Sequence, residues 1–144
     1  MHAASPQGRW QTTTMISSMR VDGTTACMTL EGATDTEVFR VYVQQVLGPT
    51  LRAGDVVIMD NLSPHKNEGT LGLIQERGAQ VRFLPAYSPD LNPIEMMWSK
   101  VKNSLRSAEA RTQSALARAV AAALASITAQ DARNWFAHCG YSFI

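Results

Sequence analysis

Two acidic residues, Asp60 and Glu95, stand at positions suited to metal-dependent chemistry. Asp60 ends the run DVVIMD at 55–60, whose apolar centre is typical of a strand buried on both faces in a parallel sheet. In open α/β sheets, ligands and catalytic groups gather at the carboxyl ends of the strands. A carboxylate there can bind a hard cation such as Mg²⁺. A structural interpretation stays open, in which Asp60 only caps the turn into Asn61.

Glu95 follows a stiff loop, PAYSPDLNP at 85–93, which contains three prolines. Asn92 is predicted to cap a helix whose first turn contains Pro93, with Glu95 at its third position. A carboxylate that is placed so rigidly suits metal binding, because coordination demands tight geometry. The alternative is that Glu95 is the acidic member of a capping box, a role that would explain it without any metal.

Basic side chains accompany both acids. His65 and Lys66 follow Asp60 closely, and His65 is either a general base or DNA contact, or a partly exposed loop residue. Lys102 and Arg106 come seven and eleven positions after Glu95 and therefore share its helical face. Residues 99–118 contain five basic residues and one acid, which indicates either a phosphate-facing strip or an ordinary solvated helix face.

The elements that must position these residues alternate between strands and helices. A hairpin is expected over 10–19 and 24–30, with Asp22-Gly23 as its tight turn. A helix with a capping box of Thr34 and Glu37 should follow and end at 48–49. Two further strands are expected, at 55–60 and 81–84. Helices are expected at 67–77, from 92 onward, at 112–127 and at 131–140, and Trp98 belongs to the apolar stripe of the helix that begins at 92. This order predicts an α/β fold with a mixed sheet flanked by helices.

Composition supports one globular domain, residues 10–144, after a short leader at 1–9. Of the 144 residues 45% are hydrophobic and 17% charged, and the net charge of +1 excludes a strongly basic coat but not a local basic patch. Ten of the thirteen basic residues are Arg, which suits phosphate binding. Cys27 and Cys139 are too isolated for a disulfide scaffold or a cysteine zinc site. No segment resembles a signal peptide or membrane span, so we expect a cytoplasmic protein with no membrane partner.

The segments GDVVIMDNLSPHK (54–66) and VRFLPAYSPDLNPIEMMWSKVKNSLR (81–106) resemble the catalytic domain of mariner-type bacterial insertion-sequence transposases. These are DDE superfamily endonucleases with an RNase H-like fold, and the resemblance covers nearly the whole chain. It implies DNA strand cleavage and strand transfer, with transposon ends and target DNA as partners at the bacterial nucleoid. Asp60 matches the second catalytic Asp and Glu95 the Glu; in the family such acids hold two Mg²⁺ or Mn²⁺ ions.

The chain departs from the family pattern at its beginning. The family's first strand, with its first catalytic Asp, precedes the position of Trp10, and no residue here matches that Asp. The resemblance therefore implies a partial domain, in which loss of a central strand leaves two unpaired edges. We expect either a marginal, aggregation-prone chain or a hairpin that closes directly onto the strand of Asp60.

Three functions follow as alternatives. The first is a transposase domain that is incomplete in itself, with an upstream-encoded transposase segment or a second copy in a homodimer as its expected partner. The second is an inactive remnant that binds DNA or an intact transposase. An unrelated hydrolase or nucleotide binder is disfavoured, because the sequence has no GxSxG, GxGxxG or Walker lysine motif.

Overall fold

The computed structural model describes residues 13–61 and 63–141. Strands β1 (Thr13–Met19) and β2 (Thr25–Glu31) form the predicted antiparallel hairpin. Gly23 in its turn has a φ of 89°, and a Cβ at this position would lie 2.8 Å from the carbonyl oxygen of Thr128, so that only glycine fits. The predicted leader and the first three residues of the predicted strand, 10–12, lie outside the described residues.

The second half of the sheet region is a parallel pair, β3 (Val56–Met59) and β4 (Gln80–Phe83), connected through α2 (Glu68–Gln75). Helix α1 (Thr36–Tyr42) precedes this pair and continues through a π turn at Val43–Leu47 into a short 3₁₀ turn at Gly48–Thr50. The predicted capping box of α1 is wrong, because Asp35 caps it by accepting from the Val38 N–H. The helix begins at Thr36, so the preceding Asp, rather than Thr34, reaches its first free N–H groups.

Helices α3 (Ile94–Ala108), α4 (Gln113–Ala125) and α5 (Ala129–His138) follow in succession. Thr112 caps α4 by accepting from the Ala115 N–H, and Thr128 forms a capping box with Asp131 at the start of α5. Within the described residues, no helix combines the length and the apolar character needed to cross a membrane.

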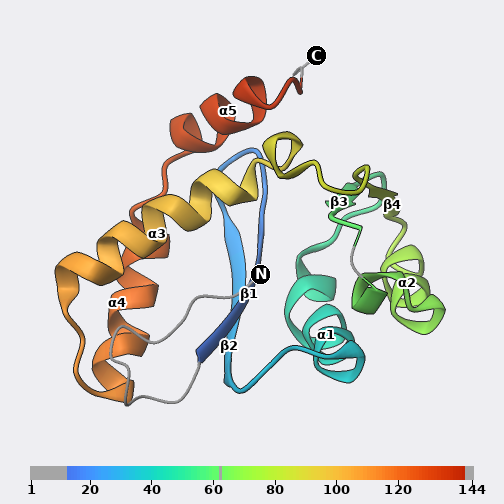
Figure 1. Ribbon diagram of the computed structural model, residues 1–144. Coiled ribbons are helices and arrows are strands. Elements are labelled where there is room, and N and C mark those ends of the chain that lie inside the picture. The colour runs from blue at the N-terminus through green and yellow to red at the C-terminus, as the bar shows by residue number, and fades with distance from the viewer. Residues whose placement is uncertain (1–12, 62, 142–144) are drawn as a thin grey trace.

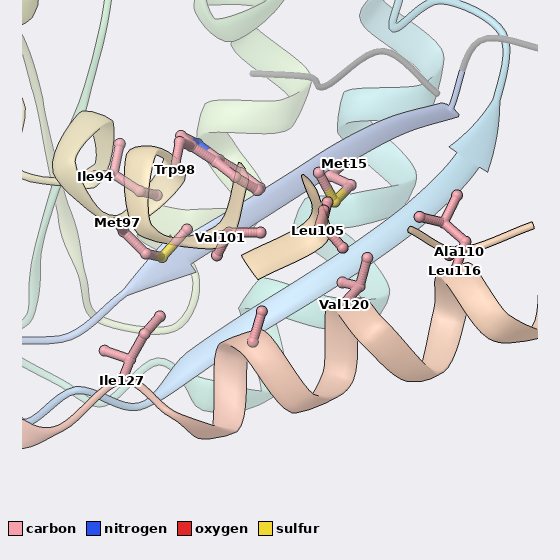
Figure 2. Close-up of a cluster of buried hydrophobic side chains, with 11 residues drawn as sticks. Met15, Ile94, Met97, Trp98, Val101, Leu105, Ala110, Leu116, Val120 and Ile127 are labelled. Carbon is pink, nitrogen blue, oxygen red and sulfur yellow. The ribbon is translucent and has the colours of Figure 1, made fainter. Parts of the chain in front are cut away.

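The hairpin stands between two groups of helices (Figure 1). Because side chains alternate along a strand, Met15 faces α3 and α4, whereas its neighbour Ile16 packs with α1 and β3. Figure 2 shows the first of these clusters, in which the apolar stripe of α3 meets β1 and α4. The predicted core position of Trp98 is confirmed, as its side chain is 3% exposed. The cluster therefore fixes α3, and with it the residues at its N-terminus.

The α/β class is confirmed, and the strands form two separate two-stranded sheets in the described part of the chain. The hairpin does not close onto β3, so this expected outcome is wrong. The expectation that the strand of Asp60 is buried on both faces is also wrong, since Val56 is 53% exposed and only Met59 within β3 is buried. The physical reason is that, in the described residues, β3 pairs with β4 along one edge only, and its residues border a cavity.

Candidate active site

A cavity of about 450 Å³ lies between β1 and β3. Arg20 and Asp55 line it where β3 begins, and Asp60 and His65 line it where β3 ends. The segment 92–94, from which α3 starts, lines the same cavity. The carboxyl end of a parallel strand and the N-terminus of a helix thus line the same cavity, a common arrangement for ligand sites in α/β folds.

Asp60 is an ionised, anchored carboxylate at this cavity. Its Oδ1 atom lies 2.7 Å from Nδ1 of His65, and the side chain is 31% exposed. The hydrogen bond from His65 lowers the pKa of Asp60 below its ordinary value and outweighs the effect of burial, which raises it. The Asp60 carboxylate is therefore in close contact with the His65 ring.

His65 lies in a 3₁₀ turn, Ser63–Lys66, and is buried. Its ring centroid is 4.3 Å from that of Phe39 on α1. The interpretation of His65 as a partly exposed loop residue is wrong, because Phe39 covers one side of the ring while Asp60 holds its edge. His65 consequently fixes the orientation of the Asp60 carboxylate.

Glu95 is exposed in the first turn of α3. The helix begins at Ile94, and Asn92 still helps to cap it by accepting from the Ile94 N–H at 3.4 Å. The predicted capping box is not formed, because Glu95 is the second residue of the helix and Pro93 takes the cap position. Since residues 92–94 line the cavity at which Asp60 lies, the helix that carries Glu95 starts at the same place.

The predicted DNA-contacting residues Lys66, Lys102 and Arg106 are all exposed. Arg106 donates to the side chain of Asn103, one turn earlier on α3. Lys100, another basic residue of the strip at 99–118, is engaged elsewhere, with its Nζ atom 2.6 Å from the carboxylate of Asp131. Lys102 and Arg106 therefore form an exposed basic face of α3, farther along the helix than Glu95.

An ion pair between Arg20 and Asp55 was not predicted from the sequence. Both guanidinium Nη atoms of Arg20 donate to Oδ2 of Asp55, at 2.9 and 2.7 Å. The pair connects the end of β1 to the start of β3 across 35 residues of sequence. No periodicity or motif signals a contact of this kind, because it depends on the relative placement of two sheets.

The carboxylates do not make a complete metal centre on their own. No group of three or more His, Cys, Asp or Glu side chains in the described residues is arranged to hold an ion. A two-ion centre needs several oxygen ligands for each cation. At the cavity the Asp60 carboxylate already lies 2.7 Å from Nδ1 of His65, so a two-ion centre would need further ligands.

Replacing His65 by Leu is expected to raise the pKa of Asp60 toward its ordinary value of 3.8, because the hydrogen bond that stabilises the carboxylate is lost. In the wild type the depressed pKa contributes stability above about pH 4, and this contribution is lost as the pH falls through the lower, folded-state pKa. The free energy of unfolding of the variant should therefore lack this pH-dependent contribution. A ¹³C NMR titration of the side-chain carboxyl carbons measures the shift.

Asp22 provides an internal control for this titration. Hydrogen bonds from Thr24 lower its pKa independently of His65, so its titration should stay unchanged in the variant. An Asp60 titration that is identical in the two proteins would show that His65 does not hold this carboxylate.

A comparison with protein-family models matches residues 2–117 to the DDE superfamily endonucleases. The chain belongs to this family, since the match covers well over half of its length. The matched residues include Asp60, His65, Glu95, Lys102 and Arg106, and the match ends within α4. Members of the family act on DNA and generally use divalent metal ions. A search of curated proteins found no significant match.

Proposed function

We propose that the chain is a catalytic domain of a mariner-type bacterial insertion-sequence transposase, which cleaves DNA and transfers the strands. The observation that carries this proposal is the meeting of Asp60 with the start of α3 at one cavity. Asp60 supplies an ionised carboxylate there, and Glu95 lies one residue beyond the part of α3 that lines the cavity. Two acids of the family pattern thus come from the end of a strand and the start of a helix.

Asp60 and Glu95 are the proposed ligands of Mg²⁺ or Mn²⁺. Two such ions, when bound, activate a water or a DNA 3′-hydroxyl and stabilise the leaving oxygen of phosphoryl transfer. His65 lies 2.7 Å from Asp60 and favours its ionised form, while the packing of α3 fixes the helix that carries Glu95. A further acidic ligand must join them, from an upstream-encoded segment or from a second copy of the chain.

Lys66, Lys102 and Arg106 are the proposed phosphate contacts. The latter two lie on the exposed face of α3 beyond Glu95, so a DNA backbone lying along this face would lead to the acids. We assign His65, which was predicted as a DNA contact, to the positioning of Asp60 because its ring is buried. A cytoplasmic location at the bacterial nucleoid remains a prediction that follows from this function.

Replacing Lys102 and Arg106 together by Ala is expected to weaken duplex DNA binding and to reduce the salt dependence of log K by about 2, roughly one for each lost phosphate contact. Fluorescence anisotropy across a range of salt concentrations measures both effects. The matched control replaces Arg40 on α1 and Arg82 on β4, which are also exposed, by Ala. Equal salt slopes for the two double variants would contradict the assignment of this face.

An inactive protein that binds DNA or an intact transposase is the second candidate. The observation in its favour is that the described residues contain no three-ligand cluster. The two functions differ in one property: the remnant retains DNA binding through α3 but does not cut DNA with any metal ion. If the protein binds DNA in a Lys102-dependent manner but does not cut it with any metal ion, the inactive remnant is favoured.

A further inference from the structure

Tyr87 combines a fully exposed side chain with a strained backbone. Its φ is 59°, in the left-handed region that a bulky residue rarely adopts. In the described residues one other non-glycine residue has a positive φ, Glu109, which ends α3 as its C-cap, where this conformation is usual. Because the side chain of Tyr87 is fully exposed, no buried contact offsets the strain. The fold itself therefore gains nothing from an aromatic ring at this position.

Tyr87 belongs to the connection between β4 and α3, which is held at several points (Figure 1). The Leu91 N–H donates to the carbonyl oxygen of Ser88 at 3.1 Å, and the Tyr141 hydroxyl donates to the carbonyl oxygen of Leu91 at 2.9 Å. Pro89 further restricts Ser88, because a residue before proline avoids the helical region. The ring of Tyr87 is thus presented from a stiff support.

Both ends of this connection lie at the candidate active site. The Leu84 N–H donates at 2.8 Å to the carbonyl oxygen of Met59, the residue before Asp60, and Asn92 lines the same cavity as Asp60. Tyr87 is three residues from Leu84 in the sequence, so their Cα atoms are at most about 11 Å apart, at about 3.8 Å per residue. Along one strand of B-DNA this distance corresponds to about three nucleotides.

We propose that Tyr87 is a stacking platform for one unpaired base of the DNA, within about three nucleotides of the phosphate at Asp60 and Glu95. The inference rests on the proposed function, since it requires DNA at these acids, and it adds the form of DNA that the site prefers. In a duplex both faces of a base are covered by neighbouring bases, whereas an unpaired base can present a face to an aromatic ring. Stacking of this kind tolerates any sequence, because every base has such a face.

Other partners match the surroundings of Tyr87 less well. A protein interface surrounds its central aromatic residues with further buried apolar side chains. The chain next to Tyr87 supplies little apolar surface, because Ala86 and Ser88 are small and Asp90 is charged. A small apolar molecule needs a concave site, and Tyr87 does not line the cavity between β1 and β3.

DNA binding by the full chain tests the inference without cleavage. Two duplexes with the same paired sequence are compared by fluorescence anisotropy, one blunt and one forked, with about three unpaired nucleotides on both strands at one end. We expect the wild type to bind the forked duplex about tenfold more tightly than the blunt duplex, a factor that stacking of one base can supply. Tyr87→Ala should bind the two duplexes equally.

Two further substitutions at the same position separate the ring from the hydroxyl and from the strain. Tyr87→Phe keeps the ring and should keep the preference for the fork. Tyr87→Gly removes the ring and relieves the strain, because glycine adopts a positive φ freely. This variant should lose the preference while its Tm is at least as high as that of the wild type.

Abasic nucleotides locate the base that stacks. An abasic position keeps the sugar and the phosphate but has no base face, so it separates stacking from phosphate contacts. Placed at each unpaired position in turn, it should reduce the preference of the wild type at one position and have no effect on Tyr87→Ala.

Four results would overturn the inference. Equal binding of fork and blunt duplex by the wild type, or a preference that Tyr87→Ala retains, would exclude stacking on Tyr87, while salt-dependent binding of both duplexes would leave the proposed function intact. A preference that Tyr87→Phe loses would indicate a hydroxyl–phosphate contact. A lower Tm of Tyr87→Gly would show that the ring supports the fold. Self-association in sedimentation that Tyr87→Ala abolishes would assign the ring to a second copy of the chain.

A wild type that binds neither duplex would contradict the proposed function and this inference together.

Discussion

Metal-dependent cleavage of DNA is expected to fall by at least about 10³-fold when Asp60 is replaced by Asn, and by a similar factor for Glu95→Gln. Each amide keeps the shape of the carboxyl group but removes the charge that attracts a divalent cation. His65 favours the ionised form of the Asp60 carboxyl group, and the neutral amide of the variant loses the charge that His65 stabilises. Cleavage of a supercoiled plasmid in Mg²⁺ and in Mn²⁺ measures the loss.

Asp22→Asn is the matched control. This carboxylate accepts from the N–H and the hydroxyl of Thr24 in an exposed turn and has no proposed catalytic role. The control variant should cut DNA as the wild type does, and all three variants should retain DNA binding through α3. Cleavage at the wild-type rate by either the Asp60 or the Glu95 variant would contradict the assignment of that acid.

Trp98→Ala is expected to lower the free energy of unfolding by about 3–5 kcal/mol, the usual cost of removing a large aromatic side chain from a core. Trp98 is 3% exposed and lies in the cluster where α3 packs against β1 and α4 (Figure 2). A typical domain is stable by only about 5–15 kcal/mol, so this loss is a large share of the total. Because the cluster fixes α3, the orientation of Glu95 should suffer as well.

Trp135→Ala on α5 is the control for this effect. Trp135 is only partly buried at the border of the same cluster, so the same substitution there should cost clearly less. Urea unfolding followed by circular dichroism gives both values. Equal destabilisation by the two variants would show that the α3 cluster is not the principal core.

Local sequence patterns predicted the elements well. The spacing of Ile94, Val101 and Leu105 predicted the buried face of α3, and Asp22-Gly23 predicted the hairpin turn, because each signal depends on residues close in sequence. The helix caps were predicted less accurately. Thr34 and Asp35 are both of types that cap helices. Which of them caps α1 depends on the residue at which the helix begins.

Long-range features could not be read from the sequence. The separation of the two sheets, the burial of His65 against Phe39 and the ion pair of Arg20 with Asp55 all depend on contacts between distant segments. The apolar run of β3 has the composition of a strand buried on both faces, yet Val56 is exposed because burial depends on the neighbouring strands rather than on the run itself.

NMR with Mn²⁺ measures whether Asp60 and Glu95 bind the same divalent ions. A bound Mn²⁺ ion broadens the amide signals of nearby residues. We expect substoichiometric Mn²⁺ to broaden the signals of Asp60 and Glu95 together, and Asp60→Asn to remove both effects. The signal of Asp131 on α5 should remain sharp. Broadening that is confined to one of the two acids, or that survives the Asp60 substitution, would contradict a shared metal site.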